Sequence, residues 1–291
     1  MLTRKSLIAF AVSLSFTVLV LCNNIRYIQA DDNPKAGESL ELTIKNVKYR
    51  FRYCPAGTFT MGSPVSERSR GNDEQLHPVT LSQGFYLAET EVTQEQWGPI
   101  MGNNPSRFRG AKLPVEQVSW DVCREFVRKL NALDAAPKGY KFALPTESQW
   151  EYACRAGSTT AYCFGDDSDR LGDYAWHPNN SSGRTHEVGT KKPNAWNLYD
   201  MHGNVWELCA DWYGNYVSED YVSERASAPA IAPIVTPVID PKGASSGSIR
   251  VRRGGGWYDV SAHCRSALRD YYAPDCTNRS IGVRVALVRG E

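Results

Sequence analysis

The sequence of 291 residues has no marked excess of charge of either sign, no long apolar run and no zinc-type cysteine pattern. Lysine plus arginine total 33 and aspartate plus glutamate total 32, a formal net charge of +1. This balance argues against a nucleic-acid partner or an anionic membrane surface. The apolar run Leu7–Leu21 is shorter than the ~20 residues of a membrane-spanning helix. Without CxxC…CxxC or paired Cys/His spacing, a structural zinc site is disfavoured.

The N-terminus has the pattern of a secretory signal peptide. Arg4 and Lys5 precede the apolar run, and the small residue Ala30 precedes the polar sequence DDNP. We predict cleavage after residue 30 and a secreted, periplasmic or otherwise extracytoplasmic protein with no membrane span after cleavage. An uncleaved N-terminal anchor is the alternative.

Cysteine usage is compatible with export. Removal of residues 1–30 leaves seven cysteines: Cys54, Cys123, Cys154, Cys163, Cys209, Cys264 and Cys276. In an exported protein cysteines normally form disulfides. Because seven is odd, at least one thiol stays free or pairs with another chain.

Long periodic helices are few. Three short helices are predicted, at 93–102, 119–133 and 146–157. The first and third begin with a capping box of Thr and Gln and end at glycine. The second has an apolar stripe of Val122, Cys123, Phe126, Val127, Leu130 and Leu133. Strand-like segments joined by tight turns follow, so we expect an α+β domain rich in loops.

The domain organisation follows from changes in composition. Residues 31–46 are polar and predict a loose leader, and residues 47–291 form one domain. Within it, 216–247 repeats YVSE and is then rich in proline, which favours extended and poorly packed chain. We interpret this stretch as a surface excursion.

Seven motifs occur in a characteristic order: PAGTFTMGS, HPVTLSQGFYLAETEVTQEQW, LPVEQVSW, LPTESQWEYACRAG, LYDMHGNVWE, RRGGGW and GVRVAL. In this order they resemble the formylglycine-generating enzyme family, also called sulfatase-modifying factors, over nearly all of residues 50–288. The resemblance implies an irregular, loop-rich, C-type-lectin-like α+β fold. It says less about activity, which depends on the site.

The resemblance also locates a candidate copper site. Active members oxidise a sulfatase cysteine with O₂ and copper(I) held by two thiolates five residues apart. Here the matching positions are Asp259 and Cys264, and a carboxylate is a poor copper(I) ligand. Gly256 replaces the usual serine, whereas Trp206 matches the active-site tryptophan. Copper binding is therefore not expected, and catalysis by Cys264 and Trp206 would require the family chemistry to survive.

A second arrangement around Cys264 is possible on paper. Asp259, His263 and Cys264 resemble a nucleophile with its base. If the segment were a strand, neighbouring side chains would point to opposite faces, so no bond from His263 to the thiol is expected.

The segment LYDMHGNVWE is similar to a calcium site of the same family. Asp200 and Glu207 would supply carboxylates, and Gly203 and Val205 backbone carbonyls; hard oxygen donors from a tight loop suit calcium. In the alternative interpretation, Asp200 caps a turn and Glu207 pairs with an arginine such as Arg253.

Non-catalytic relatives often carry cysteines together at the positions of Cys209 and Cys264. The resemblance therefore implies a disulfide between them. Two buried free thiols, or a copper-binding thiolate at Cys264, are the alternatives.

Three functions fit these patterns. The first is an exported member of the family acting on an extended polypeptide such as a sulfatase, with enzymatic activity left open. The second is a peptide- or glycan-binding module without catalysis, favoured by Tyr258, Tyr271 and Tyr272 because tyrosine gives large contact area at low entropic cost. The third is a structural domain of a larger assembly.

Overall fold

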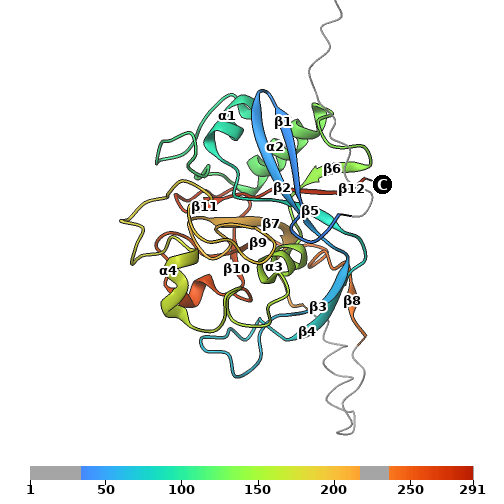
Figure 1. The fold of residues 1–291 in the computed structure, drawn as a ribbon, viewed down its shortest axis with the longest axis vertical. Coiled ribbons are helices and arrows are strands. Elements are labelled where there is room, and N and C mark those ends of the chain that lie inside the picture. Colours follow the sequence, from blue (N-terminus) through green and yellow to red (C-terminus); the bar gives the residue numbers. More distant parts are fainter. Residues whose placement is uncertain (1–33, 217–235, 291) are drawn as a thin grey trace, which may run out of the picture.

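Three β-sheets and a few short helices make up the computed structural model, which describes residues 34–216 and 236–290 (Figure 1). The five-stranded sheet has the order β1 (Ser39–Ile44), β2 (Val47–Cys54), β5 (Phe85–Ala88), β12 (Ala286–Arg289), β6 (Tyr140–Ala143). The four-stranded sheet has the order β10 (Asp270–Tyr272), β9 (Arg250–Arg253), β7 (Trp206–Trp212), β11 (Ile281–Gly282). The three-stranded sheet is β3 (Gly57–Met61), β4 (His77–Leu81), β8 (Val238–Ile239). The predicted loop-rich α+β class is confirmed.

The helices follow the capping signals in the sequence. Their bounds are α1 (Gln94–Met101), α2 (Trp120–Ala132), α3 (Glu147–Arg155) and α4 (Leu171–Tyr174), with 3₁₀ turns η1 (Ser168–Arg170) and η2 (Ser261–Cys264). Both predicted capping boxes are present, at the starts of α1 and α3. In Figure 1, α1 and α2 lie together beside the five-stranded sheet, and α3 lies between the other two sheets.

The segment predicted to be a loose leader is largely part of the fold. Within 31–46, β1 pairs antiparallel with β2 in the register Ser39↔Arg52. Leu40, Leu42 and Ile44 are buried, whereas the residues between them are exposed or half-buried. This period of two is that of a strand with one face on the core, so the leader prediction was wrong there.

Of the proline-rich excursion predicted at 216–247, the structure describes only residue 216 and residues 236–247. Residues 217–235 lie outside the described residues. Val238 and Ile239, however, form β8 and pair in parallel with β4. The signal-peptide prediction also falls outside the described residues. Within them, no helix has the length and hydrophobicity to cross a bilayer.

The main hydrophobic core lies between the five-stranded sheet and α1 and α2. Trp97 of α1 stacks on Phe126 of α2 with ring centroids 4.8 Å apart. Of the predicted stripe on α2, Cys123, Phe126 and Leu130 are fully buried, but Val122 is 40 % exposed. Val122 lies at the edge of the stripe, and its inclusion was wrong.

Buried ion pairs fix the segment that follows β9. Arg253 contacts both Glu147 and Glu151 of α3, and Arg269 binds Glu147 through two nitrogens at 2.7 and 2.8 Å. All four side chains are nearly or fully inaccessible to solvent. Leaving one such charge without its partner costs about 3–5 kcal/mol. The loop between Arg253 and Arg269 is therefore held at both ends.

Candidate functional site

The candidate site is built on the glycine-rich loop that leads from β9 into η2. Gly254 and Gly255 adopt φ values of 97° and 75°, a region that favours glycine. A Cβ on Gly255 would lie 2.8 Å from the Cys264 sulfur. Glycine is thus required both for the turn and for the close approach of the two chain segments.

The loop brings Trp206, Asp259 and Cys264 together, as the resemblance implies. The Trp206 indole N–H donates to Oδ2 of Asp259 at 2.9 Å, and the Gly256 N–H donates to the same oxygen at 3.0 Å. The Cys264 thiol lies 3.8 Å from the Asp259 backbone carbonyl. Position 259 therefore supplies a carboxylate that already has two hydrogen-bond donors.

Burial governs the protonation of the two groups. It raises the pKa of the Asp259 carboxyl, although hydrogen bonds from His263 and Trp206 oppose the shift. It also raises the pKa of the Cys264 thiol, and the Asp259 charge adds to that effect. Without a bound metal, Cys264 is consequently a protonated, inaccessible thiol at neutral pH.

His263 lies away from the thiol, but not for the predicted reason. Residues 261–264 form the 3₁₀ turn η2 and not a strand. The His263 ring lies 3.4 Å from Oδ1 of Asp259 and is half exposed. The structure thus contains no His263–Cys264 hydrogen bond, and the carboxylate is the partner of the ring.

The predicted bridge between Cys209 and Cys264 is absent, and both thiols are free. Cys209 packs in a cluster with Trp150 and Val251, whereas Cys264 packs with Tyr162 and other residues of the 161–175 segment. The two side chains occupy different hydrophobic clusters, so the predicted pair was wrong.

The calcium-like segment has a different geometry from that predicted. One oxygen of Asp200 accepts the Gly189 N–H at 2.6 Å, and the other is buried with no partner apart from Glu91. Both oxygens of Glu207 are bound by Arg284, at 2.6 and 2.9 Å, and one also accepts the Trp150 indole N–H at 2.6 Å. The alternative interpretation, in which Glu207 pairs with an arginine, is therefore correct, but the arginine is Arg284 and not Arg253.

A third acidic residue, Glu91, was missed. It is fully buried, and its carboxyl group interacts with that of Asp200 but with no other side chain that donates a hydrogen bond to it. Burial, reinforced by the Asp200 charge, raises the pKa of Glu91 well above its usual value. Burial also raises the pKa of Asp200 to about 6. No periodicity or motif in the sequence connects Glu91 with Asp200.

The carboxyl groups of Asp200 and Glu91 interact with each other, and three of their oxygens have no other protein partner, an arrangement that fits a bound cation. Glu207 is less suited to bind calcium than the resemblance implied, because its carboxylate already pairs with Arg284. No group of three or more His, Cys, Asp or Glu side chains in the described part of the chain is arranged as a metal site. A calcium ion here would therefore depend on Asp200, Glu91 and backbone carbonyls such as those of Gly203 and Val205.

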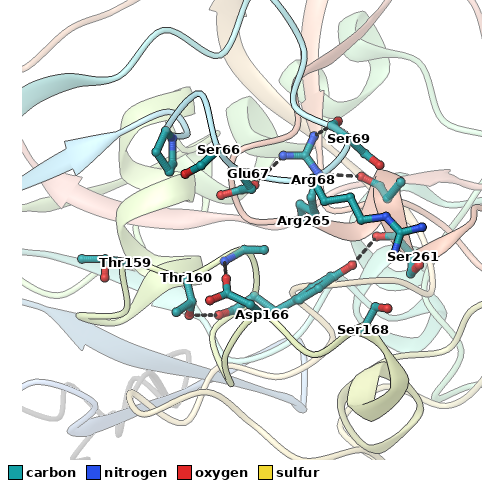
Figure 2. Close-up of a pocket in the computed structure, with 14 residues that line it drawn as sticks. Ser66, Glu67, Arg68, Ser69, Thr159, Thr160, Asp166, Ser168, Ser261 and Arg265 are labelled. Atoms are coloured by element: carbon teal, nitrogen blue, oxygen red, sulfur yellow. Dashed lines mark hydrogen bonds and ion pairs between the residues drawn. The ribbon is translucent and has the colours of Figure 1, made fainter.

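An open pocket of about 680 Å³ lies beside the same loop. Figure 2 shows its polar wall, where Arg265 reaches Glu67 at 2.5 Å and the Ser69 carbonyl at 2.7 Å. On another wall the Tyr162 hydroxyl donates to the Ser261 carbonyl at 2.9 Å. The lining is rich in hydroxyl and charged side chains: Ser66, Glu67, Arg68, Ser69, Thr159, Thr160, Tyr162, Asp166, Ser168, Ser261 and Arg265. Such a surface offers many hydrogen-bond partners to a polar ligand.

Sequence comparison decides the family. The sulfatase-modifying factor enzyme 1-like domain matches residues 49–289. The chain belongs to this family. It is 31 % identical to the formylglycine-generating enzyme of Streptomyces coelicolor over 241 residues, covering 74 % of this chain and 68 % of that protein. The α+β, loop-rich fold expected of a sulfatase-modifying factor domain is thereby confirmed.

Other relatives of this sulfatase-modifying factor domain have different names. It is 31 % identical over 185 residues to the chaperone protein LppX of Paenibacillus barcinonensis, covering 47 % of this chain and 65 % of LppX. The solved structure of Treponema denticola variable protein 1 superposes with a TM-score of 0.74 at 30 % identity, covering 85 % of this chain and 98 % of that protein. The chain thus spans about two thirds of the length of the curated relatives named here.

Proposed function

We propose that this protein is an exported sulfatase-modifying factor family member that does not oxidise cysteine by the copper route. The proposal rests mainly on position 259. A carboxylate with two N–H donors, from Trp206 and Gly256, stands where the resemblance expects a thiolate, and Cys264 is a buried, protonated thiol. A single sulfur and a hard oxygen donor do not make a copper(I) site.

Mass spectrometry tests this proposal directly. Purified protein is incubated with copper(I), O₂ and a cysteine-containing sulfatase peptide, and the aldehyde product is sought. We expect no conversion, with the Streptomyces coelicolor enzyme as positive control. Conversion by the wild-type chain would contradict the proposal, and loss of that conversion in Cys264→Ser would assign it to this site.

Export is tested separately. Because the basic start, the short apolar run and Ala30 form a signal-peptide pattern, N-terminal sequencing of the mature protein should begin at Asp31. Recovery of chains that retain Met1 from the membrane fraction would support the anchor alternative.

As a second function we propose recognition of a polypeptide at the loop-rich face formed by the pocket and residues 256–265. The supporting observation is the open, hydrogen-bonding pocket of about 680 Å³ beside an inaccessible thiol. A site that binds but lacks the reacting group is suited to recognition. A glycan is the alternative ligand.

Calcium is proposed as a structural ion near Asp200 and Glu91. Bound there, it would satisfy three buried oxygens that have no partner apart from the Asp200–Glu91 interaction. A ligand that binds only the folded state stabilises that state by mass action. Isothermal titration of chelated protein with calcium should show one binding event that Asp200→Ala abolishes.

A further inference from the structure

A patch of arginine and aromatic side chains includes Trp257 and Tyr258 of the Gly256–Arg265 loop, neither of which lines the polar pocket. We define this arginine–aromatic surface as Phe108, Arg184, Trp257, Tyr258 and Arg279. The Arg184 guanidinium lies 5.8 Å from the centre of the Phe108 ring, and that of Arg279 lies 5.1 Å from the centre of the Trp257 ring. Phe108 and Trp257 pack edge to face at 5.8 Å, which joins the two pairs. Trp257 is only 5 % exposed, so it supports the patch, and the exposed groups are the two guanidinium groups and Tyr258.

Buried contacts hold the surface in place. Asn204, which is fully buried, accepts the Trp257 N–H on its backbone carbonyl at 2.8 Å. Its side-chain amide accepts the His186 N–H at 3.0 Å and donates to the His186 carbonyl. The Trp257 indole N–H donates to the Arg279 carbonyl at 3.2 Å. The segments that carry Arg184, Trp257 and Arg279 are thus fixed relative to one another.

The two arginines on this surface are exposed, and within residues 34–216 and 236–290 neither forms an ion pair with an acidic side chain. Arg107 and Arg109, on either side of Phe108, are also exposed, and their charges lower the pKa of the buried carboxyl group of Glu116, against the effect of burial. An arginine over an aromatic ring keeps the N–H donors at its edge free for bidentate contact with a carboxylate.

We propose that this surface binds an acidic segment of a partner polypeptide. The inference deepens, and rests on, the proposed function of polypeptide recognition. The exposed guanidinium groups complement carboxylates in charge and geometry. On the same loop, Tyr258 is 41 % exposed and Val260 is 57 % exposed. A branched apolar side chain such as Val260 offers contact to apolar residues of a peptide but nothing to the hydroxyl groups of a glycan, which favours a polypeptide.

Fluorescence anisotropy with a labelled peptide of repeating Glu-Leu-Gly tests the proposal on the full mature chain. Wild-type protein should bind this peptide, bind a matched Gln-Leu-Gly peptide much more weakly, and lose affinity as salt is raised. Arg184→Gln and Arg279→Gln should each weaken binding of the acidic peptide roughly 10-fold, because each removes a hydrogen bond to a charged group.

Arg124→Gln is the matched control. Arg124 is also exposed and also lies 5.1 Å from the centre of a tryptophan ring, that of Trp120, but it is on α2. Its removal should leave the affinity unchanged. Circular dichroism of each variant checks that the fold is intact.

Three results would overturn the proposal: equal binding of the Glu and Gln peptides, unchanged affinity in the Arg184→Gln/Arg279→Gln double variant, or preference for a sulfated oligosaccharide over the acidic peptide. If the double variant bound the acidic peptide normally but Ser261→Trp in the polar pocket lost binding, the arginine–aromatic surface would not be the binding site. Polypeptide recognition by this protein would still be supported. Aldehyde formation in the copper assay would refute the proposed lack of oxidase activity without affecting the peptide result.

Discussion

Replacing Arg284 with methionine tests how far the buried acidic cluster depends on one cation. Arg284 is fully buried and binds both oxygens of Glu207, and its other hydrogen bonds among the described residues go to the carbonyls of Ala88 and Tyr199. Its charge also lowers the pKa of Glu91, opposing the effect of burial. Arg284→Met therefore leaves a buried carboxylate without its counter-charge while keeping much of the apolar stem.

The expected cost follows from the burial of the pair. Both side chains are at most 1 % exposed, so solvent cannot replace the lost contact. Breaking such a pair from one side costs about 3–5 kcal/mol. In a domain of this size the thermal midpoint should fall by roughly 6–20 °C, at ~2–4 °C for each kcal/mol. Glu207→Gln combined with Arg284→Met should recover part of the loss, because no unpaired charge remains at position 207.

The assay is urea denaturation followed by tryptophan fluorescence, with and without calcium. Arg50→Met is the control, because Arg50 is 54 % exposed and pairs with Glu41 at the surface. An exposed pair contributes ~0–1 kcal/mol. If Arg284→Met lost no more than Arg50→Met, the argument that Arg284 neutralises the cluster would be refuted.

Three further predictions concern buried titratable groups. Burial raises the pKa of Asp211 to about 7. The native state thus holds this proton more tightly than the unfolded chain, so stability should fall as pH rises from about 4 to 7, and Asp211→Asn should flatten that fall by about 1–4 kcal/mol. Chelation should lower the thermal midpoint of the wild type but not of Asp200→Ala; an unchanged response in the variant would place the calcium elsewhere. Glu91→Gln should also weaken calcium binding, and an unaltered titration would exclude Glu91 as a ligand. Cys264 should resist iodoacetamide in the native protein and react after unfolding without reductant; a thiol that becomes reactive only after reduction would indicate a disulfide.

The features that the sequence predicted well are those formed by residues close together in the chain. The Thr93 and Thr146 capping boxes form because cap and partner are three residues apart, so helix geometry alone brings them together. The seven motifs, taken together, predicted the family, and the match over residues 49–289 confirms it. The sequence predicted burial less well where the exposure of a residue depends on tertiary packing, as for the residues of β1 and for Val122.

The contents of the candidate site were decided by tertiary structure. Glu207 could have paired with any of several arginines, and the one it meets lies 77 residues later in the chain. Glu91 lies near Asp200 only because two remote segments of the chain pack against each other. Cys209 and Cys264 lie apart because each packs in a different hydrophobic cluster. Residue types and spacing fix what a side chain can bind. Which partner it finds depends on the distance and burial that the packing of remote segments imposes.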